Sequence, residues 1–449
     1  MPITVAIVGR PNVGKSTLFN RLAGKQLAIV DDTPGVTRDR ATAPSNLGGI
    51  DLNLIDTAGF DEGPPDSLPA RMVAQTKLAI ADADICLFVV DARAGLTTGD
   101  EIVAETLRKS GKPMIMVANK CESRAAEAAA PEFYALGFGE PVNLSAEHGL
   151  GLGELRDALL PFLEKTPSTE EEVAPAAEPS VRPLRLAIVG RPNVGKSSLL
   201  NRILGEERAL TSPVAGTTRD AVAAEWSYEG RAILLHDTAG LRRKARIEEK
   251  LEKLSVESTL NAVRFADCVI LVMDAREAFE KQDLTIADLI AREGRALVYA
   301  VNKWDQVTER QHAMKELRER ADRLLPQVSG AAIVAISAVT GEGMERLMPA
   351  VIEADRLWNT RMSTSELNRF LETALERNPP PAVSGRRIKI RYMTQLKARP
   401  PTFALFGNQL SALPESYMRY LANALRNVFR LPGTPIRFSL KSTKNPYAD

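Results

Sequence analysis

An eight-residue run, GRPNVGKS, occurs twice, at residues 9–16 and 190–197. It matches GxxxxGK[ST], and each copy follows an apolar run and opens a helical pattern. Its glycines let backbone amides wrap a phosphate closely, and the helix N-terminus adds a positive dipole end. Lys15 and Lys196 are expected to reach the β- and γ-phosphates as catalytic residues, and Ser16 and Ser197 to ligate Mg²⁺. The run therefore predicts two nucleoside triphosphate sites.

A second motif, DTAG, follows an apolar run at residues 56–59 and again at 237–240. Asp56 and Asp237 are placed to hold Mg²⁺ through water. Gly59 and Gly240 can turn an amide toward the γ-phosphate, a contact that hydrolysis removes. A turn without function is the alternative for DTAG alone, and the upstream phosphate loop argues against it.

Between these motifs lie PGVTRD (34–39) and AGTTRD (215–220). Thr37 and Thr218 are the expected switch threonines, which close on Mg²⁺ and the γ-phosphate. Thr33 and Thr217 are lesser candidates. The alternative for this segment is a Gly/Thr-rich surface loop.

NKWD at residues 302–305 predicts a guanine site. A carboxylate at Asp305 can accept from guanine N1–H and the 2-amino group, donors that adenine lacks, and Asn302 and Lys303 are expected to brace the base and its loops. The first copy reads NKCE, so Glu122 carries the carboxylate on a longer side chain. Backbone amides of the pairs Ser145-Ala146 and Ser337-Ala338 are candidates for guanine O6.

The residue after DTAG is Phe60 or Leu241, neither of which can orient a water as the Gln of some GTPases does. Each phosphate loop instead carries an Asn, Asn12 or Asn193, whose amide oxygen could hold a monovalent cation. That ion would neutralise charge in the transition state. The sequence therefore predicts Mg²⁺-dependent hydrolysis that potassium stimulates.

The motifs recur in the same order at offsets of 181 to 183 residues, which indicates a duplicated domain. Apolar runs predict strands at 4–8, 52–55, 85–90, 114–118, 186–189, 233–236, 269–273 and 296–301, in alternation with helices. This pattern predicts two P-loop α/β domains with doubly wound, mostly parallel sheets. We expect domains at 1–163 and 184–358, an acidic, Pro-rich linker at 164–183, and a third domain at 359–449.

The third domain is basic. Residues 359–449 hold fifteen Lys/Arg and five Asp/Glu, a net charge of +10, whereas the rest of the chain carries −9. We expect helices at 365–377 and 414–429 and strands at 387–394, 402–406 and 436–440. Alternation in RRIKIRYM predicts Arg387, Lys389 and Arg391 on an RNA-facing side, with Ile388, Ile390 and Tyr392 packed inside. A basic domain without a nucleic-acid partner is the alternative.

The three cysteines are isolated in sequence, which argues against disulfides or zinc and favours buried side chains in a reducing compartment. The N-terminus lacks a signal pattern, and no apolar run approaches about 18 residues. We therefore expect a soluble, cytoplasmic protein without a membrane span, most simply a monomer.

Two GRPNVGKS–TRD–DTAG–NKx[DE] arrays followed by a basic domain resemble the bacterial EngA/Der GTPases over essentially the whole chain. The resemblance implies a KH-like C-terminal domain (α+β), GTP/GDP as substrate and product, and ribosomal RNA and the large ribosomal subunit as partners. No GXXG occurs in the C-terminal domain, so shape-based contact with folded RNA, or docking onto a GTPase domain, is expected. The implied nucleotide-binding residues are Gly9, Arg10, Pro11, Asn12, Val13, Gly14, Lys15, Ser16, Thr17, Asp56, Thr57, Ala58, Gly59, Phe60, Asn119, Lys120, Cys121, Glu122, Ser145 and Ala146, then Gly190, Arg191, Pro192, Asn193, Val194, Gly195, Lys196, Ser197, Ser198, Asp237, Thr238, Ala239, Gly240, Leu241, Asn302, Lys303, Trp304, Asp305, Ser337 and Ala338.

The copies differ after DTAG, where the first is acidic and broken by proline and the second carries LRRKAR at 241–246. The basic segment could contact RNA phosphate in one nucleotide state, or form the charged start of a solvated helix. Two rival functions remain at this point. One is a GTP-dependent switch acting on a protein or membrane partner without RNA, and the other is an RNA-binding scaffold with degenerate nucleotide sites.

Overall fold

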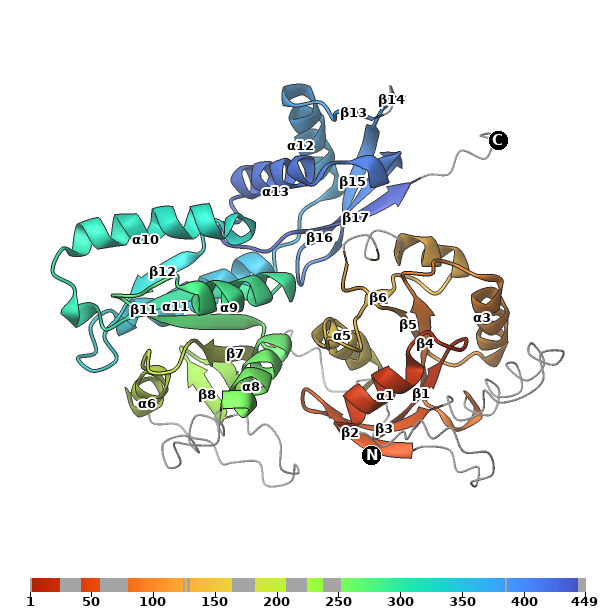
Figure 1. Cartoon of the computed structure of the whole chain (residues 1–449), viewed down its shortest axis with the longest axis horizontal. Helices are drawn as coiled ribbons and strands as arrows, with labels where there is room; N and C mark the ends of the chain where they lie inside the picture. Colours follow the sequence, from red (N-terminus) through yellow and green to blue (C-terminus); the bar gives the residue numbers. More distant parts are fainter. Residues whose placement is uncertain are drawn as a thin grey trace, which may run out of the picture. The chain divides into compact units, whose positions relative to one another are not determined.

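The computed structural model describes residues 2–24, 42–56, 80–123, 126, 130–163, 182–206, 224–236, 252–383 and 386–442 of the 449-residue chain. They fall in two compact units, Met1–Val173 and Ala174–Asp449 (Figure 1). Across these ranges, every helix is too short or too polar to cross a bilayer. We call residues 2–163 the first α/β domain, 184–358 the second α/β domain and 359–442 the C-terminal domain.

The first α/β domain is built on a six-stranded sheet with the order β2-β3-β1-β4-β5-β6. Edge strand β2 pairs antiparallel with β3, and the other pairings are parallel. The predicted strands are confirmed, each within two residues at either end. The strands are β1 (Ile3–Val8), β2 (Thr42–Leu47), β3 (Ile50–Asp56), β4 (Ile85–Asp91), β5 (Met114–Asn119) and β6 (Val142–Asn143).

The second α/β domain repeats this topology with the order β12-β11-β10-β7-β9-β8, in which β8 is the antiparallel edge strand. Strand β10 is buried at every position, as expected for a parallel strand covered on both faces. The duplication predicted from the motif offsets is therefore a duplication of fold. The strands are β7 (Leu184–Val189), β8 (Ala224–Tyr228), β9 (Arg231–His236), β10 (Cys268–Asp274), β11 (Ala296–Asn302) and β12 (Ala332–Ala335).

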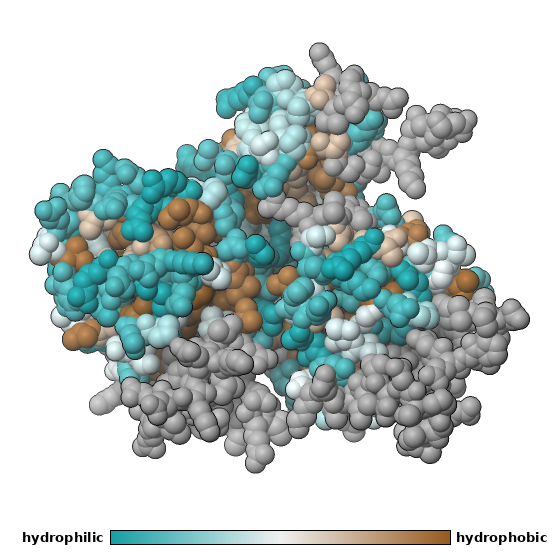
Figure 2. All heavy atoms as spheres, in the orientation of Figure 1, coloured by the Kyte–Doolittle hydropathy of each residue, from teal (hydrophilic) through white to brown (hydrophobic). Residues whose placement is uncertain are grey.

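Helices cover both faces of each sheet (Figure 1). In the second domain, α6 and α11 share one apolar core with the sheet, and α8, α9 and α10 share the other. The side of α10 that faces solvent is hydrophilic in Figure 2, in keeping with its exposed charged residues. The helices are α1 (Lys15–Ala23), α3 (Thr98–Ser110), η3 (Ala130–Leu136) and α5 (Leu152–Leu163), then α6 (Lys196–Glu206), α8 (Glu252–Phe265), α9 (Lys281–Arg292), η4 (Trp304–Gln306), α10 (Arg310–Leu324), η5 (Pro326–Val328) and α11 (Met344–Trp358).

The C-terminal domain packs two helices on a three-stranded sheet of order β15-β16-β17. Strands β15 and β16 are antiparallel, whereas β16 and β17 are parallel. The predicted helices and strands are confirmed with small shifts at their ends. The elements are α12 (Thr364–Arg377), β13 (Ala382–Val383), β14 (Arg386–Arg387), β15 (Lys389–Lys397), β16 (Thr402–Asn408), η6 (Leu410–Ala412), α13 (Glu415–Phe429) and β17 (Arg437–Ser442).

One expectation for β15 is wrong. Ile388 and Ile390 are buried as predicted, but Tyr392 is 42% exposed. The register with β16 shifts between Ile390 and Tyr392, so the strict alternation assumed from the sequence ends at Arg391. A β-bulge inserts one unpaired residue and thereby moves the next side chain to the other face.

The C-terminal domain docks on the second α/β domain through backbone groups. Arg426, buried at the end of α13, donates to the carbonyls of Pro326 and Gln327, and the Gly433 amide donates to Ser329 O over 2.8 Å. Burial lowers the pKa of Arg426 to about 10, so its guanidinium stays charged at neutral pH. These acceptors precede β12, so the docking surface lies at the amino ends of the parallel strands.

A buried ion pair supports the same edge of the second domain. Arg185 donates to the Asp267 carboxylate over 2.6 and 3.0 Å, and both side chains are buried. Burial opposes ionisation of Asp267, but the bonds from Arg185 outweigh it and keep the pKa of that carboxyl below its usual value. In the first domain the matching pair is Thr4 and Asp84, where an exposed carboxylate accepts from the backbone amide. The two copies thus differ at this edge.

We predict that Asp267→Asn destabilises the second domain by about 3–5 kcal/mol, because it leaves Arg185 buried beside an uncharged partner. The three tryptophans of the chain are Trp226, Trp304 and Trp358, all buried in the second domain, so urea unfolding followed by tryptophan fluorescence reports on that domain.

Asp84→Asn is the matched control and should leave the tryptophan transition in place. The difference between wild type and Asp267→Asn should shrink in acid, since a depressed folded pKa gives stability that is lost as the pH falls through it. An unchanged transition midpoint at pH 7 would show that the pair contributes nothing.

Candidate functional site

The phosphate loops have the same conformation in both copies. Gly14 and Gly195 open the following helices with φ of 95° and 94°, a region that favours glycine. The Lys15 ammonium donates to the carbonyl of Arg10 over 2.9 Å, and the Lys196 ammonium donates to the carbonyl of Arg191. The two lysines that the sequence predicts to be catalytic therefore bond within their own loops.

The asparagine of each NKx[DE] motif joins three segments. Asn119 Nδ2 donates to Val13 O over 2.8 Å, and its Oδ1 accepts from the Ala146 amide at 2.9 Å. Asn302 makes the matching bonds to Val194 and Ala338 at the same distances. A Cβ on Gly14 would lie 2.3 Å from Asn119 Nδ2, so the glycine is needed for this approach. Each asparagine thus braces the loops around its site, and its contact with a base stays a prediction.

The Ser-Ala pairs hold the asparagine in place. The amides of Ser145 and Ala146 donate to Leu150 O and Asn119 Oδ1, and those of Ser337 and Ala338 donate to Glu342 O and Asn302 Oδ1. Each of these four amides therefore has a protein acceptor in this structure. A contact with guanine O6 stays a prediction, and it requires the amide to be shared.

The motif lysines bind the end of a neighbouring strand. Lys120 donates to Asp91 over 2.7 Å and to Asn12 O over 2.9 Å, and Lys303 donates to Asp274 over 2.7 Å. Burial disfavours the Asp91 anion, but Lys120 and the amides of Arg93 and Ala94 outweigh it and hold the pKa of that carboxyl below its usual value. Both lysines have positive φ, near 65°, a strained conformation that the ion pairs offset.

A link from each phosphate loop to the helix that follows the fourth strand of its domain was not predicted. Arg10 Nε donates to Asp100, the third residue of the capping box that begins α3. Arg191 is held more firmly, because Asp283, Glu280 and the carbonyl of Glu277 all accept from it. The sequence does contain one signal for part of this link. The spacing of Thr97 and Asp100 is typical of a capped helix start, although it does not indicate a contact with Arg10.

The two carboxylates that the sequence predicts to read guanine have different surroundings. In the first copy, Glu122 accepts from the guanidinium of Arg93. In the second copy, the matching Arg276 lies 3.7 Å from Asp274 and not against Asp305, which is exposed. The first copy, which has Glu122 where the second has Asp305, therefore also has a neighbouring cation, Arg93, that would compete with a base for the carboxylate.

Part of the predicted metal chemistry can be located. Asp56 is buried at the end of β3, beside the strand that feeds the first phosphate loop, and Ser16 lies in the first turn of α1. Hydroxyl and carboxylate oxygens suit Mg²⁺, which keeps several waters and binds phosphate. The predicted residues outside the described ranges are Thr33, Thr37, Thr57, Ala58, Gly59, Phe60, Thr217, Thr218, Asp237, Thr238, Ala239, Gly240 and Leu241, together with the LRRKAR segment at 241–246.

The candidate potassium ligands, Asn12 and Asn193, have exposed side chains and left-handed backbones with φ of 64° and 63°. Asparagine tolerates this region better than most residues. Of the candidate RNA contacts, Lys389 and Arg391 are exposed, whereas the Arg387 side chain lies outside the described residues.

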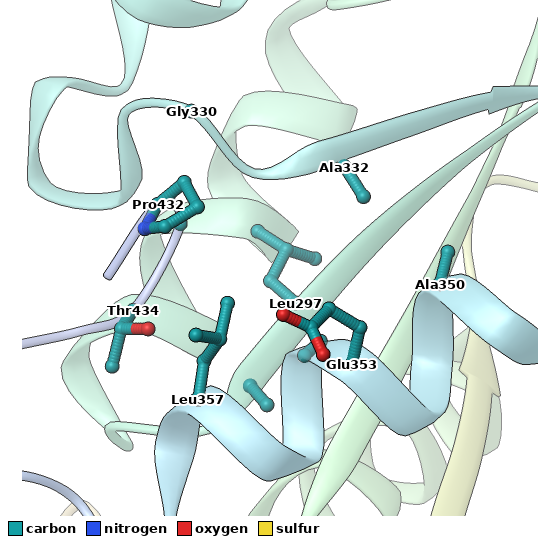
Figure 3. Close-up of a pocket in the computed structure, with 11 residues that line it drawn as sticks. Leu297, Gly330, Ala332, Ala350, Glu353, Leu357, Pro432 and Thr434 are labelled. Carbon is teal, nitrogen blue, oxygen red and sulfur yellow. The ribbon is translucent and has the colours of Figure 1, made fainter. Parts of the chain in front are cut away.

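A small apolar pocket of about 100 Å³ is unrelated to these sites (Figure 3). It lies where Pro432 and Thr434 of the C-terminal domain meet Leu297 and α11 of the second domain. Leu297 is near the amino end of β11, whereas Asn302 is at the carboxyl end. The pocket is thus an imperfectly filled part of the domain joint.

We predict that Arg191→Ala weakens guanine-nucleotide binding at the second site about tenfold. Without its anchor the loop samples conformations that cannot bind, and the apparent Kd rises as the competent fraction falls. Binding of a fluorescent GDP to a chain with Lys15→Ala measures this site. Arg292→Ala, which removes an exposed arginine of α9, is the control. Equal affinity in Arg191→Ala and the control would refute the anchoring role.

We also predict weaker guanine discrimination at the first site. Asp305 should favour GDP over inosine diphosphate, which lacks the 2-amino donor, by roughly tenfold or more.

Glu122 must first leave Arg93 before it can accept from a base, and an exposed ion pair of this kind is worth ~0.2–1 kcal/mol. Arg93→Ala should therefore raise GDP affinity at the first site up to about fivefold. Arg276→Ala should change nothing at the second, and a loss of affinity in Arg93→Ala would contradict the competition.

Comparison with known proteins agrees with this geometry. Residues 4–120 and 185–303 match the family model described as 50S ribosome-binding GTPase, and residues 255–355 match the elongation factor Tu GTP binding domain. Residues 361–441 match the model described as KH-domain-like of EngA bacterial GTPase enzymes, C-terminal.

Relatives align over the full length. GTPase Der of Rhodopseudomonas palustris (strain TIE-1) is 57% identical over 452 residues, covering 100% of this chain and 98% of that protein. GTPase Der of Rhizobium meliloti (strain 1021) is 54% identical over 468 residues, with the same coverage. Among solved structures, Era in complex with MgGDPNP and nucleotides 1506–1542 of 16S ribosomal RNA matches with a TM-score of 0.30 and 20% identity, over 58% of this chain and 93% of that one. With two bracing sites of the same design and relatives of this identity along its whole length, the chain belongs to the EngA/Der family of bacterial GTPases.

Proposed function

We propose that this GTPase uses GTP hydrolysis to control its binding to the large ribosomal subunit or its precursor, and that the chain acts as a monomer. The observation that carries the proposal is the attachment of two phosphate-loop sites to one C-terminal domain of net charge +10. Such a charge favours contact with RNA phosphate. The description of the family model that matches both GTPase domains, 50S ribosome-binding GTPase, points to the same partner.

The domain joint offers a route between nucleotide and RNA. The C-terminal domain contacts the amino-end edge of the second sheet through Arg426 and Gly433, whereas the nucleotide site lies at the carboxyl-end edge. A change at the second site can thus reach the joint through strands β11 and β12, which span both edges. The rival function, a switch on a protein partner without RNA, gains no support from a basic C-terminal domain.

Mg²⁺ and K⁺ are the proposed metal ions. Ser16 and Ser197 with Asp56 and Asp237 would hold Mg²⁺, with Thr37 and Thr218 closing on it in the GTP state. When bound, Mg²⁺ neutralises phosphate charge. Asn12 and Asn193 have exposed side chains, and an amide oxygen suits a monovalent cation.

We predict that the chain co-sediments with large ribosomal subunits in a nucleotide-dependent way. Pelleting with GDP, with a non-hydrolysable GTP analogue and without nucleotide should give different bound fractions in wild type. Lys15→Ala and Lys196→Ala should each remove part of that dependence, because each site loses the cation that binds the phosphates.

Lys109→Ala and Lys315→Ala serve as controls, since both replace exposed lysines on helix surfaces of the same two domains. Equal pelleting in all nucleotide states would contradict the proposed control by GTP. Pelleting that survives removal of the RNA from the particles would favour the protein-partner rival.

We predict faster GTP turnover in K⁺ than in Na⁺ buffer of equal ionic strength. Replacing both candidate ligands, in an Asn12→Ala and Asn193→Ala double variant, should remove the difference between the two salts. Equal turnover of wild type in the two salts would rule out potassium assistance.

A further inference from the structure

The open face of the C-terminal sheet carries an aromatic pair. Tyr392 of β15 and Phe406 of β16 are direct cross-strand partners, and their ring centroids are 5.5 Å apart. Tyr392 is 42% exposed, whereas the other aromatic side chains in the described ranges are buried or partly buried. Phe403 and Leu405, the neighbours of Phe406 along the core side, are fully buried. The pair therefore lies on the face opposite the helices.

The exposure of Tyr392 is built into the backbone. Gly407 pairs with Ile390, and a Cβ there would lie 2.0 Å from the carbonyl oxygen of Lys389. Strand β15 thus approaches β16 more closely than a side chain at Gly407 permits, beside the one-residue bulge at Arg391. Bulges re-aim side chains and recur beside functional sites. Without the bulge, Tyr392 would continue the buried series of Ile388 and Ile390.

Cations border the pair. Lys389 and Arg391 are exposed on the same strand as Tyr392. Aromatic rings beside exposed cations match the chemistry of single-stranded nucleic acid, in which bases stack on rings and phosphates meet cations. An apolar peptide would offer these two cations no counter-charge.

We propose that Tyr392 and Phe406 form a stacking site for an unpaired base of single-stranded RNA, with Lys389 and Arg391 on the adjoining phosphates. The proposal rests on the proposed RNA binding of this domain, and it adds the site and the class of RNA. The glycines of the domain, Gly385, Gly407 and Gly433, do not form a GXXG loop. Recognition would therefore use the sheet in place of a clamping loop.

The test compares binding of the full chain to a fluorescein-labelled single-stranded RNA of about ten nucleotides and to a duplex of the same length. Tyr392→Ala should weaken single-strand binding about tenfold, because a lost base–ring stack is worth about one such factor. Duplex binding should not change, since paired bases are not available for stacking. Val428→Ala, which trims an exposed apolar side chain of α13, is the matched control and should bind both RNAs as wild type does.

A Tyr392→Trp variant gives a direct readout of stacking. The native tryptophans are buried in the second GTPase domain, so the added emission reports on the sheet face. It should be quenched by the single strand, with affinity close to wild type. Equal single-strand affinity of wild type and Tyr392→Ala would overturn the stacking site while leaving RNA binding intact. If wild type bound neither RNA, both proposals would fail. Loss of subunit pelleting in Tyr392→Ala with unchanged RNA affinity would assign the face to a protein and overturn the stacking site.

Discussion

Each GTPase domain depends on one asparagine side chain. Asn119 in the first domain and Asn302 in the second connect the end of a central strand to the phosphate loop on one side and to the Ser-Ala loop on the other. The asparagine amide lies so close to the phosphate loop that glycine is required at position 14 in the first domain and at position 195 in the second. The parallel sheet makes these contacts possible, because it brings the carboxyl ends of its strands, and the loops that follow them, to one edge. These contacts hold the phosphate loop and the Ser-Ala loop together at that edge.

The two copies share this centre and differ around it. Among the described residues, Arg191 of the second phosphate loop has three acceptors, whereas Arg10 of the first donates to the carboxylate of Asp100 alone. Glu122 is paired with a cation, whereas Asp305 is exposed to an incoming base. The second domain also has the buried Arg185–Asp267 pair and carries the C-terminal domain at the same edge. Two sites with the same bracing thus have different surroundings.

The sequence predicted the fold class, the order of the strands along the chain and the phosphate loops, because these depend on local pattern and on motifs with fixed spacing. It missed edge strand β2, since TAPSNL contains a proline and few large apolar residues. It also missed the Arg10–Asp100 and Arg93–Glu122 pairs, whose members are far apart in sequence and meet only when the sheet forms. Tyr392 was predicted to pack inside because strict alternation along a strand does not anticipate a bulge, and the bulge is visible only in the pairing of β15 with β16.

We infer that each asparagine independently supports one complete nucleotide site. Calorimetric titration of GDP into the full chain counts the sites. We expect two GDP molecules per chain for wild type and one each for Asn119→Ala and Asn302→Ala, with the remaining affinity unchanged. Loss of both sites in either single variant, or two sites retained in both, would refute the independent role of each asparagine.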